Sequence, residues 1–256
     1  MSGFWALIIL GIVQGVTEFL PVSSSGHLVL LSRVFGIEDS LFVSILLHVA
    51  TLLSVIVVLR KEVWSIVRHP FSDLSKKIVV ATIPTCLIVL LIYPFITEAF
   101  EGAMLPICFM ITAIVLLATD FFLHKKKGAF SGAPLSYKQS LIMGVAQGLA
   151  TLPGISRSGS TICAGVLAGG DREKVAKFSF LMSIPVIILS MCLEIYKLIK
   201  LGSFPSVNVA GLILASILAF VVGVLSIKFM IKLTQNLNFR WFSLYLLILT
   251  IITIFV

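Results

Sequence analysis

Long stretches without a charged residue restrict what this chain can fold into. They include residues 41–59, 78–97, 102–119 and 201–227. A helix of about 20 apolar residues crosses the hydrocarbon core of a bilayer, and 59% of this chain is hydrophobic while 12% is charged. Residues 178–193 and 241–256 are shorter apolar stretches that gain length from their flanks. The sequence therefore predicts an all-α integral membrane protein, with residues 1–256 forming a single polytopic membrane domain.

One motif occurs in both halves of the chain. Residues 11–26 read GIVQGVTEFLPVSSSG and residues 144–159 read GVAQGLATLPGISRSG, an offset of 133 positions (144 minus 11) with six identities. We therefore expect two repeats, about residues 1–127 and 134–256. Each copy of the motif precedes three apolar stretches. Because three is an odd number of spans, the second repeat is expected to lie upside down relative to the first, as in inverted-repeat transporters.

Each copy contains a turn that a straight membrane helix does not tolerate. Pro21 and Pro153 are followed closely by serines, and irregular backbone at membrane depth requires surrounding protein or a water-filled cavity. We therefore predict that each half is a re-entrant helical hairpin plus three transmembrane helices, with the hairpins entering from opposite faces and meeting near the midplane. The predicted hairpins are helix 3–20, turn 21–25 and a helix from about 26, and helix 138–151, turn 152–158 and a helix from about 159.

The distribution of basic residues indicates the orientation. With both motifs re-entrant, fifteen Lys and Arg residues fall on one side, in loops 60–77, 124–138, 169–177 and 228–240. The opposite side carries three, Arg33, Lys197 and Lys200. Because basic residues concentrate in cytoplasmic loops, the first side is assigned to the cytoplasm and both termini to the outside. The net charge of +8 then follows from topology. Nucleic acid is not expected as a partner, because no basic stripe with interleaved aromatic residues occurs.

Glu18 in the first copy is a candidate functional residue. A carboxylate at membrane depth costs roughly 2.5–3.5 kcal/mol, so such a residue is by default functional or paired. The alternative is a structural glutamate bonded to neighbouring backbone. Gln14 lies four residues earlier and shares its helix face. His27 follows the turn nine residues after Glu18, and we interpret it as functional, although a lone histidine is often a packing residue.

The second copy, PGISRSGST at residues 153–161, has the composition of an anion-binding turn. Arg157 carries a planar fork of donors suited to phosphate oxygens. Glycines let backbone N–H groups approach an anion, and the start of the next helix adds its positive dipole end. The alternative is that Arg157 pairs with Glu18 as a structural bridge. Further hydroxyl groups come from Ser156, Ser158 and Thr161.

Several other small or polar residues are interpreted as packing residues. Paired glycines four apart predict close helix packing, here between the two hairpins; they are Gly11, Gly15, Gly144 and Gly148. The cysteines lie in apolar segments without CxxC spacing and are interpreted as core residues. His48 lies inside an apolar stretch, where it either lines the cavity or packs.

The two motifs together resemble a known family. The string QGVTEFLPVSSSGH at residues 14–27, with PGISRSGST at residues 153–161, is similar to the signatures of the bacterial undecaprenyl-diphosphate phosphatase family, also called the bacitracin-resistance protein. Residues 169–185, GGDREKVAKFSFLMSIP, extend the resemblance over most of the chain. It implies hydrolysis of undecaprenyl diphosphate to undecaprenyl phosphate and inorganic phosphate, which recycles the lipid carrier of peptidoglycan synthesis. It also implies a multi-pass protein of the bacterial cytoplasmic membrane.

The resemblance implies roles for the motif residues. The catalytic positions are Glu18, His27, Ser24 and Arg157. The positions that bind the diphosphate are Ser23, Ser25, Ser156, Arg157, Ser158, Gly159 and Thr161. A divalent cation, Mg²⁺ or Ca²⁺, is expected on Glu18 with help from Gln14. Many family members carry Glu where this chain has Gln14, and glutamine cannot serve as an ionised ligand or a general base. Glu18 is thus the one carboxylate within the two motifs.

Three questions stay open at this point. The nucleophile is His27, Ser24 activated by His27, or water. The partners implied are a polyprenyl diphosphate, whose tail would leave the cavity between helices, and membrane lipids, while a homodimer is neither required nor excluded. An alternative function is transport or flipping of polyprenyl phosphate, since inverted repeats with broken helices are common in secondary transporters.

Overall fold

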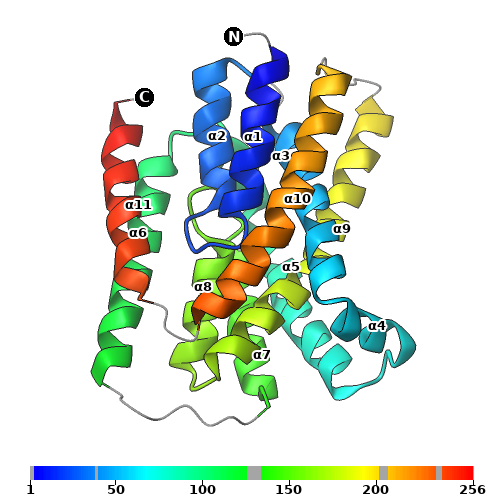
Figure 1. Cartoon of the computed structure of the whole chain (residues 1–256), viewed down its shortest axis with the longest axis vertical. Helices are drawn as coiled ribbons and strands as arrows, with labels where there is room; N and C mark the ends of the chain where they lie inside the picture. Colours follow the sequence, from blue (N-terminus) through cyan, green and yellow to red (C-terminus); the bar gives the residue numbers. More distant parts are fainter. Residues whose placement is uncertain (1–2, 38–39, 126–133, 202–206, 235–237, 256) are drawn as a thin grey trace.

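The computed structural model describes residues 3–37, 40–125, 134–201, 207–234 and 238–255 (Figure 1). Throughout these ranges the secondary structure is helical, as predicted. The first half holds α1 (Gly3–Thr17), α2 (Ser24–Phe35), α3 (Ser40–Val58), α4 (Arg60–Arg68), α5 (Asp73–Ala99) and α6 (Leu105–Lys125). The second holds α7 (Tyr137–Leu149), α8 (Arg157–Leu167), α9 (Arg172–Leu201), α10 (Val209–Thr234) and α11 (Phe239–Ile254).

Five of the described helices are long and apolar enough to cross a membrane, namely α3, α5, α6, α9 and α10. Large apolar side chains on them face outward, including Leu91 on α5 and Ile199 on α9. An outward apolar surface of this extent suits lipid as the surrounding solvent. The predicted multi-pass membrane protein is therefore confirmed. The last apolar stretch, at residues 241–256, forms α11, which is apolar but shorter.

The two hairpins have earlier helix ends and starts than the sequence predicts. The first helix of each hairpin is α1, which ends at Thr17, or α7, which ends at Leu149. The predicted helices were therefore three and two residues too long, respectively. The following helices start at Ser24 and Arg157, two residues before the predicted positions. The reason is capping: the Ser23 side chain accepts a hydrogen bond from the Gly26 N–H, and Ser156 does the same for Gly159.

The predicted loop 60–77 is also partly wrong, because it contains α4 and the start of α5. The helix α4 is short and polar, so its sequence does not resemble a membrane span. It is nevertheless amphipathic, and Val63 and Ile66, three residues apart, pack against the main core. In Figure 1, α4 lies at the end of the molecule opposite the two termini.

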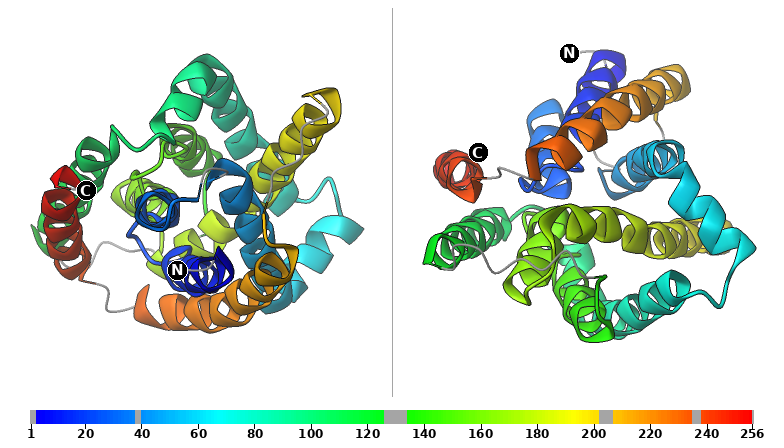
Figure 2. Two further views of the ribbon diagram at one scale, coloured as in Figure 1. Left: turned by 90° about the horizontal axis from the view of Figure 1, so that it is seen from above. Right: turned by 60° about the horizontal axis from the view of Figure 1, so that its bottom comes forward.

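Longer helices surround the two hairpins. In the view from above, α2 and α8 lie near the centre of the helical assembly (Figure 2). The descending helix α1 packs along α10, and α7 packs along α5. Each hairpin thus rests against a long helix from the other half of the chain. This arrangement leaves the two turns facing each other in the interior.

The glycines mark these helix pairs and not a contact between hairpins. A Cβ atom added at Gly11 would overlap the backbone of Ala215 on α10, and one at Gly144 would overlap the backbone of Ala81 on α5. The prediction of close helix packing is confirmed. The predicted contact between the two hairpins was wrong, because the glycine faces of α1 and α7 pack against α10 and α5 and point away from the other hairpin.

Gly11→Ala is therefore expected to lower the melting temperature of the detergent-solubilised protein by about 5 °C, since overpacking of this kind costs about 1–3 kcal/mol. Gly3→Ala is a matched control in the same helix, because a Cβ there has open space around it. A thermal-shift measurement on both variants checks this. Equal melting temperatures would contradict the close approach of α1 and α10.

Candidate active site

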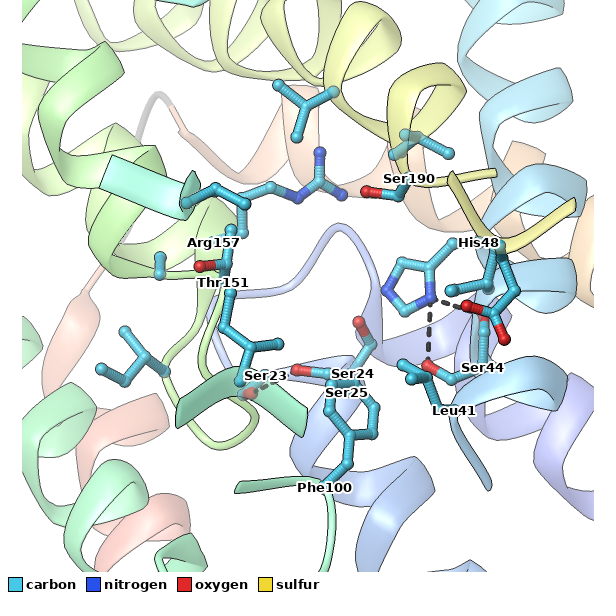
Figure 3. A pocket seen from close by; sticks show the side chains of 18 of the residues that line it. Ser23, Ser24, Ser25, Leu41, Ser44, His48, Phe100, Thr151, Arg157 and Ser190 are labelled. Atoms are coloured by element: carbon cyan, nitrogen blue, oxygen red, sulfur yellow. Dashed lines mark hydrogen bonds between the residues drawn. The ribbon is translucent and has the colours of Figure 1, made fainter. Parts of the chain in front are cut away.

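The two turns meet on one pocket, which is bounded further by α3, α5 and α9 (Figure 3). The first turn is anchored by Phe19, whose ring packs edge-on against Phe180 of α9 at a centroid distance of 5.3 Å. Two hydrogen bonds join the turns directly. The Gly154 N–H donates to Ser23 Oγ at 3.1 Å, and Ser158 Oγ donates to the carbonyl of Leu20 at 2.8 Å.

Glu18 lines this pocket and lies just after the last residue of α1. Its side chain is only 2% exposed, and described side chains from four helices surround the carboxylate. Gln14 Nε2 donates to Oε2 at 2.9 Å, and His48 Nε2 lies 3.1 Å from the same oxygen. The Ser24 hydroxyl also donates to Oε2, and the Arg157 guanidinium donates to Oε1. Such donors compensate a charge that would otherwise be too costly to bury.

Arg157 is the first residue of α8, so its side chain stands at the positive end of that helix. It joins the second half of the chain to Glu18 in the first half, 139 residues away. In Figure 3 its guanidinium extends across the pocket toward Ser190. The sequence offered a structural bridge and an anion site as alternatives. Arg157 is both paired with Glu18 and part of the pocket lining, so the two descriptions are compatible.

Not all residues of the predicted diphosphate site reach the pocket. Five of them line it: Ser23, Ser25, Ser156, Arg157 and Ser158. The described lining does not include Gly159 or Thr161. Gly159 donates its N–H to Ser156 as part of the helix cap. Thr161 is fully buried and its hydroxyl lies 2.6 Å from that of Ser179, which ties α8 to α9.

Ser23 has an unusual backbone conformation. Its φ of 64° and ψ of 89° place a residue with a side chain in the left-handed region, which costs roughly 1–3 kcal/mol and often marks a functional site. Gly154 holds its side chain from the opposite turn. This backbone kink ends the first turn and starts α2 at Ser24.

His27 is separate from this cluster. Its Nδ1 lies 2.7 Å from the Ser23 carbonyl oxygen and its Nε2 lies 2.6 Å from the Tyr245 hydroxyl. The ring lies nearly parallel to that of Tyr245 and meets Phe109 edge-on. Within the described residues, the pocket lining contains the serines that precede His27 but not His27. The structure thus brings Glu18, Ser24 and Arg157 together and places His27 next to α6 and α11.

His48 lines the pocket, whereas the sequence left open whether it lines the cavity or packs in the core. It lies on α3, faces the pocket in Figure 3, and contacts Glu18. Its Nδ1 lies 2.7 Å from the Ser44 carbonyl oxygen. The signal in the sequence was a lone titratable residue within an otherwise uncharged stretch.

The residues around Glu18 fit a divalent cation only in part. No group of three or more His, Cys, Asp or Glu side chains able to hold a metal occurs among the described residues. The buried Oε1 of Gln14, however, has no hydrogen-bond partner in the described structure, while the Nε2 of the same amide donates to Glu18. Mg²⁺ is commonly bound by one or two carboxylates together with substrate phosphates. The pair fits a cation that arrives with a phosphate ligand, not a preformed cage.

Comparison with known proteins gives consistent matches over nearly the whole chain. The profile of the family described as "Bacitracin resistance protein BacA" matches residues 7–252. The Carboxydothermus hydrogenoformans protein named undecaprenyl-diphosphatase is 39% identical over 256 residues, which cover 97% of this chain and 95% of that protein. Proteins of the same name from Thermosipho melanesiensis and Treponema denticola are 39% and 40% identical, over 95% and 96% of this chain and 96% and 94% of their own lengths.

Proposed function

Because this chain belongs to the bacitracin resistance protein BacA family, we propose that it is an undecaprenyl-diphosphatase. It hydrolyses undecaprenyl diphosphate to undecaprenyl phosphate and inorganic phosphate, and so recycles the lipid carrier of peptidoglycan synthesis. The family and the names of its relatives support the substrate. The site supports the chemistry independently, as follows.

The observation that carries the chemistry is the meeting of two helix starts at one pocket. Residues 23–25 begin α2, residues 156–158 begin α8, and both triplets line the pocket. A helix start presents N–H groups and a partial positive charge, which favours phosphate. Arg157 adds a full charge and a fork of donors at the same place. A site with two helix starts and one guanidinium is better suited to bind a diphosphate than to bind a neutral ligand.

Phosphoryl transfer depends mainly on positioning and on neutralising the phosphate oxygens. We expect Arg157 to exchange its bond with Glu18 for the terminal phosphate. Glu18 then accepts the proton of the attacking hydroxyl, which belongs to Ser24 or to water. The new oxygen–phosphorus bond forms as the bond to the bridging oxygen breaks, and undecaprenyl phosphate leaves. If Ser24 attacks, water subsequently cleaves the phosphoserine and restores the hydroxyl.

A divalent cation, Mg²⁺ or Ca²⁺, bound by Glu18 and Gln14, would neutralise further charge on the diphosphate. Ser23, Ser25 and Ser156 are proposed to orient the phosphate oxygens. The catalytic role that the family resemblance implied for His27 remains a prediction, and the contacts of this residue support a different role.

The proposed membrane arrangement is an inverted repeat in the bacterial cytoplasmic membrane with both termini outside. Two observations support it. The pairs α1–α10 and α7–α5 use equivalent glycines, Gly11 and Gly144, against a long helix of the opposite half. The termini lie at one end of the molecule and α4, which carries basic residues, at the other (Figure 1); basic segments favour the cytoplasmic side.

The same orientation gives the pocket an outward opening. Its lining runs along α9 from Val186 to Lys197, eleven residue steps or roughly 16 Å of helix. Lys197 and Tyr93 lie toward the ends of α9 and α5, on the side of the termini (Figure 1). The wall between is largely apolar, with Ile96 and Leu193 among its residues. We propose that the prenyl chain leaves along this wall into the outer leaflet.

Phosphate release from undecaprenyl diphosphate by the purified protein in detergent tests the proposed function. One phosphate per lipid is expected, and a chelator is expected to lower the rate by about tenfold or more, with recovery on adding Mg²⁺ or Ca²⁺. Detergent micelles have no second compartment, so a transporter would release no phosphate there. Absence of release, together with movement of polyprenyl phosphate across vesicles, would favour the transport alternative.

A further inference from the structure

The hydrogen bonds of His27 leave neither ring nitrogen free. A carbonyl oxygen can only accept, so the Nδ1 atom next to the Ser23 carbonyl carries the proton. In the neutral ring, Nε2 then has only its lone pair, and the Tyr245 hydroxyl donates to it. A nucleophile or general base needs that lone pair. Tyr245 occupies it at 2.6 Å, and the two rings lie nearly parallel, with their centroids 5.7 Å apart and 4° between the planes.

The contact that His27 makes toward the site goes through the peptide group between Ser23 and Ser24. The Ser23 carbonyl accepts from the His27 ring at 2.7 Å and from the His27 backbone N–H at 3.2 Å. This carbonyl belongs to the peptide unit that immediately precedes Ser24. Ser23 has left-handed backbone angles that a side-chain-bearing residue rarely adopts, so the peptide needs external support to keep its orientation. The hydroxyl of Ser24, one residue on, donates to Glu18.

We propose that Tyr245 and His27 form a positioning arm for Ser24. Tyr245, on α11, fixes the tautomer and the angle of the His27 ring. His27, on α2, fixes the Ser23–Ser24 peptide, and Ser24 then presents its hydroxyl to Glu18. His27 acts through Ser23 and takes no part in bond making. The inference rests on the proposed function for its activity readout, and Tyr245 is a residue that neither motif contains.

His27→Asn and His27→Ala separate a positioning role from a chemical one. The side-chain nitrogen of asparagine occupies about the position of Nδ1 and can donate to the Ser23 carbonyl, whereas alanine cannot. We expect His27→Ala to lower kcat by about 100-fold, because small displacements of a reacting group have effects of that size. His27→Asn should keep roughly a tenth or more of the wild-type kcat. The KM should stay within about threefold in both, since Arg157 is unchanged.

A reactive imidazole predicts a different result. In that case His27→Asn would be as inactive as His27→Ala while both proteins elute and melt like the wild type. That outcome would overturn the proposal, and so would a large rise in KM without loss of kcat.

Tyr245→Phe tests the outer part of the arm. It keeps the stacked ring and removes the hydroxyl, and kcat is expected to fall about fivefold. Because asparagine at position 27 no longer reaches Tyr245, the double variant H27N/Y245F should be no slower than His27→Asn alone. Multiplying effects would show that Tyr245 does not act through His27. Tyr196→Phe is the matched control, since Tyr196 is 60% exposed on α9.

A second readout does not depend on catalysis. Amide hydrogen exchange of a peptide spanning residues 19–28 reports how firmly the turn is held. We expect His27→Ala to raise the exchange rate of this segment by about tenfold and His27→Asn to leave it near the wild-type rate. Unchanged exchange in His27→Ala would overturn the arm. A wild-type protein that releases no phosphate but shows this exchange pattern would contradict the proposed function alone.

Discussion

Replacing Arg157 by alanine is expected to lower kcat/KM for undecaprenyl diphosphate by about 1,000-fold, which corresponds to roughly 4 kcal/mol of lost transition-state stabilisation. Arg157 combines the charge of a guanidinium with the start of α8, and it lies on the pocket beside Ser24 and Glu18. Removing it takes away the donor fork that is proposed to hold the terminal phosphate. Phosphate release by purified variants over a range of lipid concentrations measures the effect.

Arg157→Lys is the informative comparison for this variant. Lysine keeps the charge but cannot offer two parallel N–H donors. The kcat/KM of Arg157→Lys is therefore expected to exceed that of Arg157→Ala by about tenfold, which is only a partial rescue. Folding must be checked, because alanine leaves the buried Glu18 without its charged partner. Near-wild-type turnover by Arg157→Ala, with an unchanged elution profile, would refute the assignment of the phosphate site.

Glu18→Gln is expected to lower kcat by about 100-fold with a smaller change in KM. An amide has the shape of the carboxylate but cannot accept a proton from the attacking hydroxyl. It would also turn an N–H group toward donors, since the side chains of Ser24 and Arg157 both donate to this carboxylate. Single-turnover measurements at saturating lipid isolate the chemical step.

Glu173→Gln serves as the control for this second variant. Glu173 forms an i,i+4 ion pair with Lys177, and both side chains are more than one-third exposed, so its neutralisation should change turnover by less than about twofold. If Glu18→Gln were as active as Glu173→Gln, the proton acceptor would have to be sought elsewhere in the pocket. His48 would then be the next residue to replace.

The parts of the fold that follow from hydropathy could be predicted from the sequence. Spans of about 20 apolar residues can be recognised directly in the sequence, and a proline-containing turn between two apolar segments indicates a hairpin. The pairing of Glu18 with Arg157 was also foreseeable as one of two alternatives, because opposite charges at membrane depth need partners. Helix starts were less predictable, since they depend on whether a serine side chain turns back to cap the helix, as Ser23 and Ser156 do.

The remaining errors concern partners far apart in the chain. Residue spacing along the chain does not show that Tyr245, 218 residues after His27, contacts its ring. In the same way, a glycine face predicts close packing without naming the helix that covers it. His48 could not be separated from a core residue, because its role depends on Glu18 approaching α3 from another part of the chain. These are questions of tertiary arrangement that residue spacing does not encode.

The crossed packing of the hairpins has a consequence for biosynthesis. The glycine face of α1 is covered by α10, which begins at Val209, whereas α7 finds α5 already made. As the chain emerges from the ribosome and enters the membrane N-terminus first, the first hairpin must therefore wait, with its glycine face uncovered, until most of the protein has been inserted. A chain truncated before α10 would hold every motif residue and still be a target for quality-control proteolysis. The last helices to enter the bilayer thus include the one that covers the first hairpin, although the described pocket lining contains no residue of α10 or α11.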